Sequence, residues 1–255
     1  MFRRWWFLGL LRPAEQGPRP PGRRESKEAG ELVLREWQVL RDRLSAIAAE
    51  RVAAAGDLFR AAELRLPPGE TAARRDYLWA LEAYEAAGRL LDEAAGLPDG
   101  TDLPDLTAAV VLAEQAVERL AAAHTVHAGG RPRPFAVRCF YNPLHGPAAV
   151  PAAGGGKAVS RKSRRRPTVG AREAAADRRP ACTSCRNAIL AGQSPDVLPA
   201  LLPAARTGRR GGPPVLVPYY AVPQQWSPWS ATACGAYDEG TPALVLRGGH
   251  RRPRT

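Results

Sequence analysis

The sequence is poor in the residues and motifs from which catalytic sites are built. Its 255 residues include four cysteines, four histidines and one methionine, and aromatic residues make up 7%. It contains neither a G-x-S-x-G motif nor a glycine-rich phosphate-binding loop, the patterns typical of serine hydrolases and of nucleotide-dependent enzymes. These absences favour a non-enzymatic protein.

The sequence also lacks an apolar run that could cross a membrane. The run at residues 5–11 has seven residues, against about 20 for a membrane-spanning helix, and no small-residue cleavage site follows it. We therefore expect a cytoplasmic protein, with peripheral membrane contact through Trp5, Trp6 and Phe7 as an alternative role of its N-terminus. Thiols stay reduced in the cytoplasm, so the cysteines are interpreted as metal ligands before disulfides.

Charge is divided sharply along the chain. Residues 31–128 hold 10 basic and 17 acidic residues, whereas residues 129–255 hold 20 basic and 5 acidic ones. The first 30 residues, with 7 basic and 3 acidic, are rich in proline and predict a flexible basic segment. These blocks of charge indicate that the parts of the chain have separate roles. The basic parts would attract nucleic acid, anionic membranes or acidic protein surfaces.

Apolar periodicity predicts a mainly α protein with an antiparallel three-helix bundle over residues 31–128. The first helix runs from about 31 to 66, where two prolines stop it. The second covers about 71–95, before the stop signal Gly-Leu-Pro, and the third begins after an Asp102 cap. Connections of about five residues make neighbouring helices antiparallel. The expected inner faces are Trp37, Leu40, Leu44, Ala48, Val52, Ala55, Phe59, Ala62 and Leu66, then Tyr77, Leu81, Tyr84, Gly88, Leu91 and Ala95, then Leu106, Val110, Ala113, Val117, Leu120 and His124.

The rest of the chain predicts a small irregular α+β module over residues 129–240, followed by a basic tail over 241–255. Within the module, residues 151–180 begin with a glycine run and continue with a cluster of basic residues, a low-complexity composition that predicts a disordered insertion. We expect His250 to be exposed in the tail. The expected contacts with nucleic acid or an anionic membrane come from Arg161, Lys162, Arg164, Arg165 and Arg166.

One Cys/His pattern in the module is typical of a metal site. Cys139 and His145 have the spacing C-x5-H, and Cys182 and Cys185 form a later C-x2-C. Zinc is bound tetrahedrally by thiolates and imidazoles, and C-x2-C lets two thiolates reach one ion from a tight turn. The sequence Asn-Pro within the first element marks a turn that returns His145 towards Cys139. We therefore expect a structural zinc ion, with Cys234 as an alternative fourth ligand in place of His145.

Other interpretations of these residues stay open. Cys139 and His145 could form the thiolate–imidazole pair of a thiol enzyme. Cys182 and Cys185 could form a redox pair, although no βαβ pattern surrounds this C-x2-C. All four cysteines can also be small buried hydrophobic residues. His124 and His127 form H-x2-H without another ligand nearby, and we expect His124 to be a core histidine of the third helix.

The order of a ligand-bearing turn and a C-x2-C that opens a helix resembles treble-clef zinc modules. The sequence also resembles uncharacterised hypothetical proteins of high-GC bacteria, on the element C-F-x-N-P-x-H-G at residues 139–146, the later C-x-x-C and the Ala/Leu-rich residues 76–95. This resemblance implies that the Cys/His module is one unit and implies no activity. We thus expect a non-enzymatic scaffold or interaction protein with a zinc-stabilised module, or alternatively a nucleic-acid-associated zinc protein.

Overall fold

The structure, a computed structural model, describes residues 23–62, 64–67, 69–96, 103–149, 179–202 and 214–251. The predicted fold class is confirmed: the chain is mainly helical, with three packed helices, a small two-stranded sheet and a Cys/His cluster. It divides into two compact units, one made of the described residues up to Phe135 together with those from Val197 on, the other of Ala136–Asp196.

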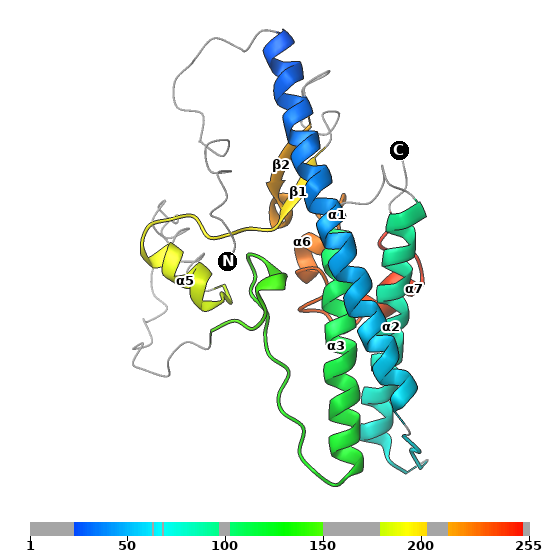
Figure 1. Cartoon of the computed structure of the whole chain (residues 1–255). Helices are drawn as coiled ribbons and strands as arrows, with labels where there is room; N and C mark the ends of the chain where they lie inside the picture. The colour runs from blue at the N-terminus through cyan, green and yellow to red at the C-terminus, as the bar shows by residue number, and fades with distance from the viewer. Residues whose placement is uncertain are drawn as a thin grey trace. The chain divides into compact units, whose positions relative to one another are not determined.

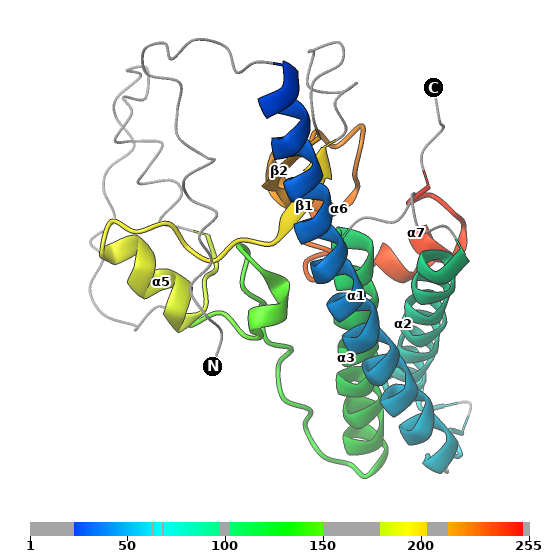
Figure 2. The same cartoon turned by 45° about the horizontal axis from the view of Figure 1, so that its top comes forward.

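Three long helices form the first unit. They are α1 (Arg23–Ala61), α2 (Thr71–Gly96) and α3 (Leu103–His127). They lie side by side in both views and alternate in direction along the chain (Figure 1, Figure 2). None of the described helices is long and apolar enough to cross a membrane.

The inner face predicted for the second helix was wrong. Tyr77, Leu81, Tyr84 and Leu91 are half-buried, and the buried stripe lies about a third of a turn away. The reason is that small side chains let helices approach closely, so α2 turns its alanines rather than its aromatic residues towards the packed side. That buried stripe consists of Ala73, Asp76, Ala80, Ala83, Ala86, Ala87, Leu90 and Ala94.

The third helix is buried on nearly all sides over its first half. Leu106, Val110 and Ala113 are buried as predicted, but so are Thr107 and Val111 on other faces. The reason is that α3 contacts α1, α2, β1 and α6. At its far end, the prediction of a core histidine was wrong, because His124 is exposed.

The C-terminal residues 197–251 belong to this first unit. Trp229 is buried, and its Nε1 donates a hydrogen bond to Asp105 Oδ1 at 2.6 Å, in the first turn of α3. This division differs from the expected domains, which joined residues 197–240 to the Cys/His module and gave residues 241–255 as a tail. The elements of this segment are β1 (Pro199–Leu202), β2 (Val215–Pro218), η4 (Tyr219–Ala221), α6 (Trp229–Thr232) and α7 (Thr241–Leu246), with β1 and β2 antiparallel and α7 packed against α2.

His250 is buried, which corrects the expectation of an exposed tail residue. Its Nε2 lies 2.9 Å from Glu93 Oε2, and Glu93 also accepts hydrogen bonds from Arg89 and Arg251. Burial alone would raise the pKa of Glu93, but the hydrogen bonds from Arg251, His250 and Arg89 outweigh it and lower this pKa to about 2. The acidic helix α2 therefore binds the basic C-terminal residues of the same chain.

Arg119 of α3 joins three further segments of this unit. Its guanidinium lies 4.8 Å from the ring centroid of Trp79 and 4.0 Å from that of Phe135. It also donates to Asp76 Oδ1 at 3.0 Å and to Glu239. The side chains of Asp76 and Arg119 are 6% and 12% exposed, so this is a largely buried ion pair held between two aromatic rings.

The second unit, Ala136–Asp196, is small and irregular. Its described elements are a single β-bridge between Arg138 and Pro147, the 3-10 turn η2 (Pro143–His145) and the helix α5 (Thr183–Leu190). Two backbone hydrogen bonds connect its two described segments, from Phe140 N to Pro180 O and from Ala149 N to Ala181 O. The predicted insertion 151–180 lies almost entirely outside the described residues, as does the N-terminal segment with Trp5, Trp6 and Phe7.

Candidate metal centre

The first two candidate ligands lie at the ends of one tight turn. Cys139 N donates to Gly146 O at 3.0 Å, which brings Cys139 next to His145. Within the turn, Asn142 Oδ1 accepts from Leu144 N at 3.1 Å. Gly146 has φ 76°, a left-handed conformation that glycine adopts at little cost and that lets the chain turn back. The Asn-Pro sequence therefore forms the turn that was predicted from it.

The other two candidate ligands lie at the start of α5. Cys182 is the N-cap of this helix, and its Sγ accepts from Cys185 N at 3.5 Å. The two sulfur atoms thus meet at a helix N-terminus, where the partial positive charge of the helix dipole stabilises thiolates.

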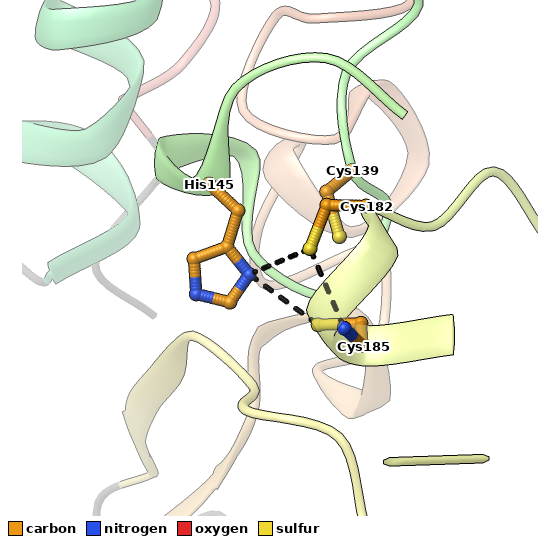
Figure 3. A group of neighbouring side chains, drawn as sticks. All are labelled: Cys139, His145, Cys182 and Cys185. Atoms are coloured by element: carbon orange, nitrogen blue, oxygen red, sulfur yellow. Dashed lines mark hydrogen bonds between the residues drawn. The ribbon is translucent and has the colours of Figure 1, made fainter. Parts of the chain in front are cut away.

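The turn and the helix place four donor atoms around one point, as Figure 3 shows. One sulfur each from Cys139, Cys182 and Cys185 and one nitrogen of His145 all lie within 4.8 Å of one another. His145 Nδ1 is 3.5 Å from Cys182 Sγ and 3.3 Å from Cys185 Sγ. A zinc ion with tetrahedral Zn–S and Zn–N bonds would separate nitrogen from sulfur by about 3.5–3.6 Å and sulfur from sulfur by about 3.8 Å. The two nitrogen-to-sulfur distances are therefore close to those of a zinc site, and all four donor atoms lie near enough to one another to hold one ion.

The opposite nitrogen of the His145 ring contacts a carboxylate. Nε2 lies 3.1 Å from Asp196 Oδ2, so a proton on Nε2 can be donated to Asp196, and Nδ1 would face the sulfur atoms with its lone pair once a metal ion replaced its proton. A carboxylate that fixes the tautomer and orientation of a ligating histidine is a common feature of zinc sites. Asp196 was not among the predicted site residues, because it follows Cys185 by 11 positions and carries no motif of its own.

The protonation of the four groups is interdependent. The hydrogen bond from Cys185, supported by one from His145, outweighs burial and lowers the pKa of Cys139 to about 3. The same hydrogen bond to Cys139, together with burial, raises the pKa of Cys185. Hydrogen bonds to Asp196 first and Cys139 second raise the pKa of His145 to about 10. Crowded thiols and an imidazole thus share protons, and a bound cation would take the place of these protons.

We predict that Asp196→Ala weakens metal binding about tenfold without abolishing it. Loss of a carboxylate behind a metal-bound histidine typically lowers affinity 10–100-fold, and the low end applies because the Asp196 side chain is 52% exposed. Affinity can be measured by competition with a chromophoric zinc chelator. Gln193→Ala, at an exposed position of the same segment, is the control, and equal affinities of the two variants would contradict the role of Asp196.

The structure thus brings together Cys139, His145, Cys182 and Cys185 and leaves Cys234 outside this cluster. Cys234 is buried in the other compact unit, in the segment of the chain that connects α6 to α7. His127 lies elsewhere too, at the end of α3, where its Nδ1 is 2.7 Å from Glu70 Oε2. Among the described residues, no other group of His, Cys, Asp and Glu has comparable spacing.

The Cys/His cluster that the sequence pattern implied is therefore present, and four side chains stand close enough together to hold a metal ion. The resemblance to hypothetical proteins of high-GC bacteria stays a prediction. No protein family, no curated protein and no solved structure matches this chain.

Proposed function

We propose that this chain is a non-enzymatic interaction protein whose residues 136–196 fold around one zinc ion. The observation that carries the proposal is the convergence of three sulfur atoms and one imidazole nitrogen within 4.8 Å. Three thiolates select a soft or borderline ion over magnesium or calcium, which prefer oxygen ligands. An iron–sulfur cluster places inorganic sulfide and more than one iron between its protein ligands, and donor atoms this close leave no room for them.

The number of ligands supports a structural role. Catalytic zinc sites keep a coordination position open for water or substrate and use three protein ligands. Here Cys139, His145, Cys182 and Cys185 supply four, which completes a tetrahedron. The same argument disfavours a thiol enzyme, because His145 and Cys139 would both be occupied by the metal.

The charge of the chain supports binding to an acidic partner. Residues 129–255 carry 20 basic and 5 acidic residues, which attracts acidic protein surfaces and polyanions. Nucleic acid is the second candidate partner, favoured by nine basic residues within 157–179. Because that stretch has no aromatic residue, its contacts would be with phosphates, and its affinity would fall steeply with salt.

We predict that the purified chain contains one zinc ion, which Cys182→Ser releases. Serine cannot replace a thiolate as a soft ligand, so the site would lose one of its four zinc bonds. Elemental analysis of both proteins, after removal of loosely bound metal, measures the stoichiometry.

The matched control is Cys234→Ser, another buried cysteine that lies outside the cluster and should leave the zinc content unchanged. Full zinc retention in Cys182→Ser would refute the site. Loss of zinc in Cys234→Ser, together with retention of zinc in His145→Ala, would instead show that Cys234 is the fourth ligand.

A further inference from the structure

A groove runs between α1 and α2, independent of the metal centre. It has a volume of about 540 Å³. Its lining spans 12 residues of α1 and 15 of α2, or about 16 Å and 21 Å of helix axis. It is thus three to four helical turns long. The lining residues are Ala49, Val52, Ala53, Gly56, Phe59 and Arg60 of α1, and Tyr77, Leu81, Tyr84 and Leu91 of α2.

The two walls of the groove differ in size. The α1 wall contains the small residues Ala49, Ala53 and Gly56, which let another backbone approach closely, beside the larger Val52, Phe59 and Arg60. The α2 wall consists of two tyrosines and two leucines, and Phe59 of α1 packs on Tyr84 with ring centroids 5.3 Å apart. A Cβ atom at position 56 would lie 2.7 Å from the Tyr84 hydroxyl, so a larger residue there would displace this tyrosine from its position. Small residues facing large ones form a surface into which a helix can pack.

Four large apolar side chains of α2 lie on the groove, whereas Leu90 is the one large apolar residue of its buried stripe. That stripe is mostly alanine, whereas Tyr77, Leu81, Tyr84 and Leu91 line the groove and remain half-exposed. Burial of large apolar side chains stabilises a fold more than burial of alanine does. A face of α2 with four large apolar side chains is therefore left partly open by the part of the chain that the structure describes.

The charged residues along the groove indicate which kind of partner it would attract. Asp57, Glu85 and Asp92 are exposed, and each directly follows a lining residue. Only Asp57 among them has a described basic partner, Arg60. The acidic residues 31–128, with 17 acids against 10 bases, would repel a second copy of the same face. A partner with basic flanks would be attracted.

We propose that the α1/α2 groove binds an amphipathic partner helix of three to four turns with an apolar face and basic flanks. Such a helix would complete a four-helix arrangement with α1, α2 and α3. Its apolar residues, spaced at i, i+3, i+4 and i+7, would contact Phe59, Tyr77 and Tyr84, and its lysines or arginines would face the acidic rim.

The test uses a labelled 14-residue peptide of leucine and lysine in this spacing, titrated against the full chain by fluorescence anisotropy. The counterpart with glutamate in place of lysine tests the charge. Ala53→Trp should fill the groove, while Ala54→Trp places the same side chain at the adjacent exposed position of α1, outside the lining. We expect saturable binding of the basic peptide, at least tenfold weaker in Ala53→Trp and within twofold of wild type in Ala54→Trp.

Three results would overturn the proposal. The first is absence of binding, or binding that the two variants affect equally. The second is equally tight binding of the acidic peptide. The third is a wild-type dimer in sedimentation that Ala53→Trp alone dissociates, which would make a second copy the occupant.

Discussion

Replacing Arg119 by methionine is expected to destabilise the helical unit by about 3–5 kcal/mol, the usual cost of removing one partner from a buried ion pair. Methionine keeps the packing of a long side chain against Trp79 and Phe135 but leaves the carboxylate of Asp76 without its main partner. Asp76 is only 4% exposed, so water cannot replace the lost interaction. The free energy of unfolding can be measured from the helical circular-dichroism signal in urea.

The matched control for this prediction is Arg75→Met. Arg75 also lies near Asp76, at 3.6 Å, but its side chain is 74% exposed, and exposed ion pairs contribute about 0–1 kcal/mol. Adding Asp76→Asn to Arg119→Met should recover part of the loss, because the uncompensated charge is then removed. Similar stabilities of the Arg119 and Arg75 variants would show that the pair is not buried in solution.

The ends of the helices were predictable where a residue restricts the conformation of the backbone. The second helix was expected over about 71–95 and extends over Thr71–Gly96, because glycine followed by leucine and proline forms a strong stop. The first helix was predicted less well. It begins at Arg23, ahead of the apolar periodicity, because polar residues with good helix propensity extend it. It ends at Ala61, before the two prolines that were expected to stop it.

The orientation of the faces could not be predicted from apolar side chains alone. The large side chains of Tyr77 and Tyr84 suggested that these residues face the core. The alanines at positions 73, 80 and 87 allow closer packing of the helices, and they belong to the stripe that is buried. His250 illustrates the same limit. Its neighbours in sequence are basic and polar, and the carboxylate that binds it, Glu93, lies 157 positions away.

The candidate metal ligands were predictable because their chemistry is encoded locally. The Asn-Pro turn near Cys139 and the C-x2-C at the start of a helix each specify their own geometry. Asp196 was not predictable, because it reaches His145 through the loop after α5 and no spacing rule joins the two. Residues 197–240 were predicted to belong to the Cys/His module. No local sequence signal indicates that they group with the helices instead, because this grouping comes from contacts of α6 with α3 and of α7 with α2.

Removing the metal ion is expected to unfold residues 136–196 and to leave the three long helices intact. Apparent zinc-binding free energies of small zinc modules are about 10–16 kcal/mol, and such modules are commonly unfolded without metal. The three long helices bury apolar side chains of their own, so we expect their folding not to depend on an ion. In the small unit the buried apolar side chains that the structure describes are Cys139, Tyr141, Pro143, Ala181, Cys182 and Cys185.

Half of those buried side chains are candidate ligands, so without an ion the described part of the unit would keep only Tyr141, Pro143 and Ala181 as its other buried apolar side chains. Loss of the metal should therefore release both segments that the backbone hydrogen bonds at Phe140 and Ala149 hold together. Cys182→Ser should show the same behaviour before any chelator is added. Cys234→Ser should behave as the wild type.

Hydrogen exchange of the full chain, followed by mass spectrometry with and without a strong zinc chelator, tests the dependence of residues 136–196 on a metal most directly. Peptides from 136–149 and 179–196 should be protected with metal and should exchange rapidly once it is removed. Peptides from α1, α2 and α3 should exchange at the same rate in both states. Unchanged protection of 136–149 and 179–196 after complete metal removal would contradict a zinc-dependent unit, as would loss of protection throughout the helices.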